Sequence, residues 1–130
     1  MAGISIHVID VSRGVPAAGM AVEVWKLDAG GQSRISAGAI DAQGHYDDAA
    51  LATRELAPGR YAARFEIGAY YRGVDIALPE PAFLESVVFE FGLANSAQHY
   101  HLPLKMTPWI FFVQGRIMSA LPLRLYRRLR

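Results

Sequence analysis

The chain has 130 residues, 52% of them hydrophobic and 19% charged, with a formal net charge of +1 at pH 7 and no cysteine. This length suits one domain with a hydrophobic core, so we expect no second domain, and the lack of cysteine excludes a fold held by disulfides. No apolar stretch reaches about 18 residues, and the N-terminus lacks a basic segment followed by an apolar one, so we predict a cytoplasmic protein without a membrane span.

Charge is distributed unevenly along the chain. Residues 1–90 carry 7 Lys and Arg against 12 Asp and Glu, a balance of −5, whereas residues 91–130 carry 6 Lys and Arg and no acidic residue, a balance of +6. Such a basic end can bind nucleic acid, an anionic membrane or the acidic part of its own assembly. Because few charges are involved, we favour the last and expect no nucleic-acid partner and no membrane anchor. The basic residues are chiefly Arg116, Arg124, Arg127, Arg128 and Arg130.

Alternation of apolar and polar residues predicts a series of short β-strands. In the first, Ile4 and Ile6 belong to one face, so their burial places the His7 side chain on the opposite face. Gly, Pro and Asp mark the turns, and at Asp41–Gly44 aspartate stands first and glycine fourth, as in a type I turn. The expected strands, in chain order, cover residues 4–9, 20–27, 33–40, 60–67, 86–91 and 99–106.

Residues 70–78 interrupt the pattern of strands and could form one short helix, which Pro79 and Pro81 would end. Regularly spaced short strands separated by turn residues are typical of a two-sheet sandwich. The predicted fold is therefore an all-β sandwich with one short helix and a C-terminal extension.

Three of the four histidines lie on the expected strands. In the last strand, His99 and His101 share one face, while Tyr100 belongs to the other, apolar face. Imidazoles can therefore line a polar surface without disturbing the core. Because an imidazole is well suited to act as a general base near neutral pH, His7, His99 and His101 are candidate site residues.

Two separated motifs carry a resemblance to a known family. The first is His-Val-Ile-Asp at 7–10 followed by Arg-Gly-Val-Pro-Ala-Ala-Gly-Met at 13–20, and the second is His-Tyr-His-Leu-Pro-Leu at 99–104. The turn Asp-Ala-Gln-Gly at 41–44 lies between them. Over about residues 4–109, this pattern resembles the transthyretin-like family and in particular its hydrolase branch, which opens the ring of 5-hydroxyisourate, the first oxidation product of urate.

The resemblance implies a transthyretin-like two-sheet β-sandwich that assembles as a homotetramer, a dimer of dimers. It also implies a small heterocyclic substrate and a reaction without metal or cofactor. It assigns His7 and His101 as the catalytic pair that positions and deprotonates a water, with His99 in a supporting or structural role. Lysine replaces the first of these histidines in the hormone-carrying transthyretins, so His7 favours the enzymatic branch.

Two positions depart from the hydrolase pattern. The family has a substrate-binding arginine after its Asp-x-Asp-Gly turn, where this chain has His45, which lacks the permanent charge and the planar fork of donors. The family also ends with Tyr-Arg-Gly-Ser, where this chain has Gln-Gly-Arg-Ile at 114–117. Arg116 is therefore either a substitute cation in the site or an ordinary surface arginine. We treat His45, His99 and Arg116 as candidate substrate-binding residues, with His45 and Arg116 as candidates to stabilise an oxyanion.

We expect a transthyretin-like domain at 1–115 and a basic C-terminal extension at 116–130. Trp109–Val113 is too apolar to remain in water and should continue the last strand or cover a neighbouring surface. From Ile117 onward, apolar residues recur at helical spacing, interrupted by Pro122. This extension could pack on a neighbouring subunit, form a lid over the site or touch a membrane, and we favour the first two.

Three other interpretations stay open. His-x-His on one strand face with a third imidazole could bind zinc, but without cysteine or a nameable carboxylate nearby a metal site is disfavoured. The chain could also be a related enzyme acting on another nitrogen heterocycle, or a binding or scaffolding protein that lost the chemistry. His45 and the altered terminus favour such a change, whereas the presence of both His7 and His101 opposes loss of catalysis.

Overall fold

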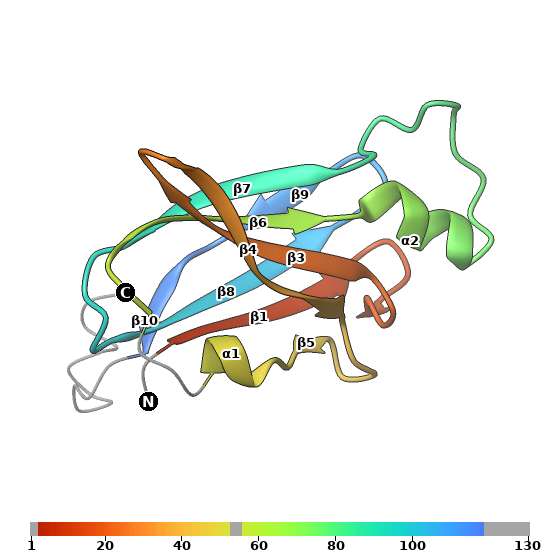
Figure 1. Ribbon diagram of the computed structural model, residues 1–130. Helices are drawn as coiled ribbons and strands as arrows, with labels where there is room; N and C mark the ends of the chain where they lie inside the picture. The colour runs from red at the N-terminus through yellow and green to blue at the C-terminus, as the bar shows by residue number, and fades with distance from the viewer. Residues whose placement is uncertain (1–2, 53–55, 119–130) are drawn as a thin grey trace.

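The computed structural model describes residues 3–52 and 56–118, and Figure 1 shows two β-sheets that face each other. One sheet is six-stranded and has the order β10-β8-β1-β2, with β5 paired to β1 and β9 paired to β8; the other is four-stranded and has the order β4-β3-β6-β7. The predicted two-sheet sandwich is confirmed. The first sheet contains β1 (Gly3–Asp10), β2 (Val15–Pro16), β5 (His45–Tyr46), β8 (His99–Met106), β9 (Phe111–Val113) and β10 (Arg116–Met118); the second contains β3 (Ala21–Asp28), β4 (Gly31–Ala39), β6 (Gly59–Phe65) and β7 (Val87–Leu93).

Strand β1 has a core face and an outer face, as its alternating sequence predicts. Ile4 and Ile6 are each 1% exposed and Val8 is 0% exposed, and they join the hydrophobic core between the two sheets. Ser5 and His7 point the other way and are half-buried. The strand therefore contributes to the core and still presents polar side chains on the outer surface of the six-stranded sheet.

Strands β1 and β8 run parallel and pair along their whole lengths, from Gly3 opposite His99 to Asp10 opposite Met106. Parallel partners need a long crossover connection, and here it is made by the entire second sheet and both helices. Figure 1 shows the two strands side by side in the centre of their sheet. This pairing brings the two sequence motifs together, with Ser5 opposite His101.

The helix expected at 70–78 is α2, which spans Ile67–Gly73 and therefore both begins and ends earlier than expected. Ile67, Tyr70 and Tyr71 recur at the helical spacing of three and four residues, and all three side chains are buried. Assigning Ile67 to the preceding strand was therefore wrong. Asp75, in the turn after the helix, has a positive φ of 63°. Among the described residues, no helix is long and apolar enough to cross a membrane.

The six expected strands lie within two residues of their predicted bounds. The sequence pattern did not predict β2, β5 and the short helix α1 (Ala49–Ala52), because segments of two to four residues are too short to show a periodicity.

The segment after β8 turns back as two short strands. Phe111–Val113 forms β9, which pairs antiparallel with the end of β8, while Trp109 and Ile110 stay more than half exposed in the turn. Strand β10 then pairs with the beginning of β8. The helical spacing suggested from Ile117 onward is therefore wrong for Ile117 and Met118, which lie in β10. The arginine-rich residues 119–130 lie outside the described part of the chain.

Candidate functional site

The turn at Asp41–Gly44 positions His45 beside β1. The carboxylate of Asp41 accepts hydrogen bonds from the backbone N–H groups of Gln43 and His45, both at 2.9 Å, and its carbonyl accepts one from Gly44 at 3.0 Å. The His45 hydrogen bond is the main cause that holds the pKa of Asp41 below its usual value. The expected turn is thus confirmed, and it delivers His45 into β5, directly opposite His7.

His7 and His45 form a close pair of imidazoles. Their ring centroids lie 4.6 Å apart with the planes inclined at 36°. His7 Nε2 lies 3.2 Å from the carbonyl oxygen of Gln43, which can only accept, so this nitrogen carries the proton and donates. The lone pair of neutral His7 is then on Nδ1.

Gly44 keeps the space beside the His7 ring open. A Cβ atom at this position would lie 3.0 Å from His7 Cδ2 and Nε2 and 2.9 Å from the carbonyl oxygen of Val8. The residue also has a positive φ of 93°, which favours glycine. The tight turn and the close ring approach therefore both require glycine here.

A serine hydroxyl links the other two histidines. Ser5 Oγ lies 2.7 Å from His101 Nδ1 and 2.8 Å from His99 Nε2. All three side chains are half-buried and belong to the outer face of the six-stranded sheet. Because its Nδ1 is engaged with Ser5, His101 has Nε2 as the nitrogen available to a water or a substrate.

The environment of His101 keeps its imidazole uncharged. Burial is the main cause that lowers the pKa of His101 from its ordinary value of 6.5, and the neighbouring His7, His99, Arg116 and His45 add to the effect in that order. A charged ring is disfavoured by removal from water and by nearby positive charge. At neutral pH His101 is therefore a neutral group that can accept a proton.

Strand β10 places Arg116 opposite His101. Arg116 is half-buried, and its buried Nε has no hydrogen-bond partner among the residues that the structure describes. Its charge acts on the His101 ring. Of the two readings of Arg116 left by the sequence, this placement favours a cation at the site over an ordinary surface arginine.

The structure thus brings together all five residues selected from the sequence. His7 and His45 pair across β1 and β5, and His99 and His101 share Ser5. Sequence reasoning missed Ser5, although its position was readable, because it alternates with the buried isoleucines on the same face as His7. The five selected residues are His7, His45, His99, His101 and Arg116.

Within the described residues, no group of three or more His, Cys, Asp or Glu side chains is arranged to hold a metal ion. A hollow of about 370 Å³ lies away from the histidines, and its lining contains no imidazole or carboxylate. The histidine face therefore remains the candidate site. The hollow is lined by Val11, Lys105, Met106, Thr107, Ile110 and Phe112.

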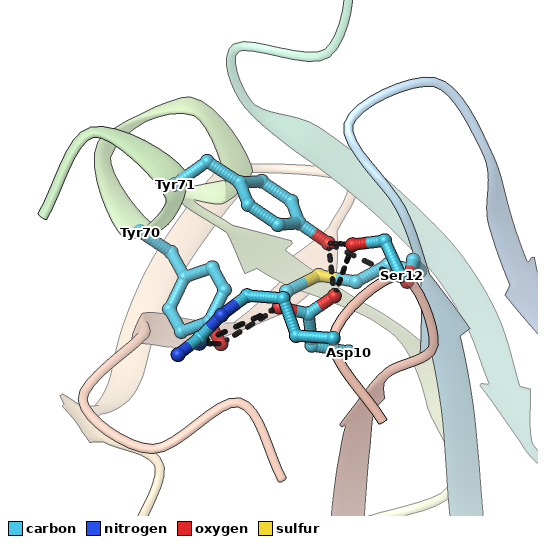
Figure 2. A network of polar contacts seen from close by, with 6 residues as sticks. Asp10, Ser12, Tyr70 and Tyr71 are labelled. Carbon is cyan, nitrogen blue, oxygen red and sulfur yellow. Dashed lines mark hydrogen bonds and ion pairs between the residues drawn. The ribbon is translucent and has the colours of Figure 1, made fainter. Parts of the chain in front are cut away.

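A second polar cluster lies under α2, at the end of β1 (Figure 2). The Asp10 carboxylate is 0% exposed and accepts hydrogen bonds from Ser12 at 2.6 Å, Tyr71 at 2.7 Å and Tyr70 at 3.0 Å. Arg13 donates to the Tyr70 hydroxyl at 3.0 Å. This cluster ties the helix to β1 and to the loop that follows it.

The fold and the outer histidine face together define a transthyretin-like β-sandwich with an imidazole cluster on its six-stranded sheet. The sequence model of the HIUase/Transthyretin family matches residues 4–114, and the chain belongs to this family. The expected family membership is confirmed.

Similar proteins agree with this assignment. The chain is 42% identical over 106 residues to a 5-hydroxyisourate hydrolase from Mesorhizobium japonicum, covering 82% of this chain and 85% of the relative. It is 34% identical over 111 residues to a 5-hydroxyisourate hydrolase from Pseudomonas aeruginosa, covering 85% and 88%.

Solved structures share the same fold. Transthyretin from Sparus aurata superposes with a TM-score of 0.79 at 22% identity, covering 92% of this chain and 100% of that one. An (S)-allantoin synthase superposes with a TM-score of 0.80 at 25% identity, covering 88% of this chain. The present chain spans only 43% of the length of that synthase.

Proposed function

We propose that this chain hydrolyses 5-hydroxyisourate and opens its ring. Relatives named for this activity are 42% and 34% identical over most of both chains. The observation that carries the proposal is the half-buried, neutral His101, held by Ser5 and facing Arg116, on the same surface as His7. This arrangement provides a base and a cation at one place.

In the proposed reaction, His7 and His101 hold a water, and His101 Nε2 takes a proton from it. The hydroxide adds to a ring carbonyl, and the charge that develops on the carbonyl oxygen is stabilised by Arg116 and by hydrogen bonding from His45. The carbon–nitrogen bond then breaks, and the leaving nitrogen receives the proton. His101 is neutral again at the end of the cycle.

A second candidate function follows from His45. The family's hydrolases have arginine at this position, and a histidine cannot supply the same permanent charge and fork of donors. A related reaction on another nitrogen heterocycle of different charge would suit the site of this chain. Absence of activity on both 5-hydroxyisourate and related heterocycles would instead indicate a binding or scaffolding protein.

The proposal includes an assembly and a location: a homotetramer built as a dimer of dimers, in the cytoplasm. Sedimentation-equilibrium analysis of the full chain measures the mass of the assembly. A monomer at working concentration would contradict the assembly.

The decisive experiment is incubation with freshly generated 5-hydroxyisourate, followed by its ultraviolet absorbance. We expect the absorbance to decay faster than in the spontaneous reaction, in proportion to protein concentration. A decay equal to the spontaneous rate would reject this substrate, and a panel of related cyclic ureides would then test the second candidate.

A further inference from the structure

One serine hydroxyl lies between two imidazoles. Ser5 Oγ is within hydrogen-bond distance of a ring nitrogen from His101 and one from His99, at 2.7 and 2.8 Å. A hydroxyl has one proton to donate and lone pairs to accept with. When the Ser5 proton lies in one of these two contacts, Ser5 donates to one ring and accepts from the other, and the tautomers of the two histidines are coupled.

Two proton arrangements place the Ser5 proton between the rings. In the first, His101 carries its proton on Nδ1 and donates it to Ser5, which donates to His99 Nε2. This leaves the His101 Nε2 lone pair free to act as a base. In the second, His99 Nε2 donates to Ser5 and Ser5 donates to His101 Nδ1, so that the proton of His101 is on Nε2. Of the two, only the first lets His101 Nε2 accept a proton from water.

We propose that Ser5 is a positioning residue that selects the active tautomer of His101 and relays its proton to His99. This rests on the proposed hydrolysis and deepens it. As His101 Nε2 takes a proton from water, the Nδ1 proton moves to Ser5 Oγ and the Ser5 proton moves to His99 Nε2. One proton enters at His101, one arrives at His99, and the hydroxyl is restored.

The positions of the neighbouring charges favour this transfer. Arg116 lies opposite His101 on β10, whereas His99 lies opposite Met118, two residues further along the same strand. His7, His99 and His45 also act on the His101 ring, from β1, β8 and β5. The relay therefore moves positive charge away from the ring that lies opposite the arginine.

The first test is the tautomer and titration of each ring, recorded by long-range ¹H–¹⁵N NMR on protein with ¹⁵N-labelled histidine. In wild-type protein we expect neutral His101 to carry its proton on Nδ1 and the His99 and His101 signals to titrate as a coupled pair. In Ser5→Ala we expect mixed tautomers of His101 and separate titrations. Unchanged tautomer and coupling in Ser5→Ala would overturn the proposal.

The second test is kinetic. We expect Ser5→Ala to lower kcat about tenfold with KM unchanged, a part of the total contribution of general base catalysis. Ser5→Thr keeps the hydroxyl and should restore most of kcat, while Ser33→Ala, at an exposed serine of β4, should change nothing. A kcat for Ser5→Ala equal to that of wild type would contradict the relay.

A replacement variant and the substrate-free NMR measurement keep the proposal testable. If Ser5→Ala fails to fold, Ser5→Cys fills the same space with a weak donor and should show the same loss of coupling. The NMR measurement needs no substrate. Wild-type protein that shows the coupled titration but does not accelerate 5-hydroxyisourate decay would therefore reject the proposed function while leaving the proton-sharing unit supported.

Discussion

The two faces of β1 carry polar groups in opposite situations. On the core face, the fully buried Asp10 carboxylate accepts hydrogen bonds from three hydroxyl groups. On the outer face, Ser5 and His7 contact other imidazoles in a half-buried surface. The proton positions are fixed on the first face, because a carboxylate can only accept, whereas on the second they can move between ring nitrogens and a hydroxyl. One face is therefore suited to hold structure and the other to transfer protons.

Burial acts on both faces and has different consequences. It is the main cause that raises the pKa of Tyr71, so this hydroxyl stays protonated and remains a donor to Asp10. It is also the main cause that lowers the pKa of His101, so this ring stays neutral and remains an acceptor. In each case removal from water disfavours the charged form. The same physical effect gives a permanent donor under α2 and an available base on the outer sheet.

The largest expected effect is on the core face. Asp10→Ala leaves the hydroxyls of Ser12, Tyr70 and Tyr71 without their acceptor, and we expect it to lower the free energy of unfolding by about 3–5 kcal/mol. Urea denaturation measures this change. As control, Asp47→Ala at an exposed position should stay within about 0.5 kcal/mol of wild type. Equal stability of the two variants would show that the buried cluster is dispensable.

On the outer face, we expect His101→Ala and His7→Ala to lower turnover of 5-hydroxyisourate by about a hundredfold each, roughly 2.7 kcal/mol, while the protein stays folded. Circular dichroism checks the fold and initial rates measure the loss. Full turnover in both variants would remove these histidines from the mechanism and would break the contrast between the faces.

Removal of β10 should have a smaller effect than loss of a catalytic histidine. A chain ended after Gln114 lacks Arg116, the cation opposite His101, and we expect turnover to fall on the order of tenfold, with a less stable assembly. A chain ended after Met118 keeps β10 and is the matched control. If the shorter chain kept both its rate and its tetramer, Arg116 would have no part in the chemistry.

The pH dependence of kcat/KM tests the role of His101 on the outer face without a mutation. Because the pKa of His101 is lowered below 6.5, the acid limb of kcat/KM should have its midpoint below that value. The unfolded chain binds a proton at this histidine more readily than the folded chain, so this group's contribution to stability is lost as pH falls from about 6.5 through the folded pKa. A midpoint above 6.5 would mean that another group limits the rate.

The smallest expected effect concerns His45. We expect His45→Arg to raise turnover of 5-hydroxyisourate several-fold, because arginine restores a permanent charge and a fork of donors beside His7. His45→Gln, which removes the imidazole without adding charge, is the control. If wild-type protein already turns over at a rate that His45→Arg does not raise, the exchange is neutral.

Part of the fold and the site was determined by the sequence itself. Alternation along residues 4–9 placed Ser5 and His7 opposite the buried isoleucines, because a strand has a period of two. The Asp41–Gly44 turn was readable because aspartate and glycine satisfy local backbone requirements. The histidine motifs were recognisable because their residue types and order resemble a family with known chemistry.

Only the tertiary structure decided which of these groups meet. The parallel pairing of β1 with β8 places Ser5 between His99 and His101, and no local pattern specifies that register. Strand β10 forms where the sequence had helical spacing, because pairing with β8 satisfies its backbone groups. In the sequence Asp10 is only the last residue of a motif, and its role became visible in the structure, where the hydroxyls of Tyr70 and Tyr71 in α2 donate hydrogen bonds to its carboxylate. Periodicity reports the face on which a residue lies, whereas its partner is set by contacts between segments distant in the chain.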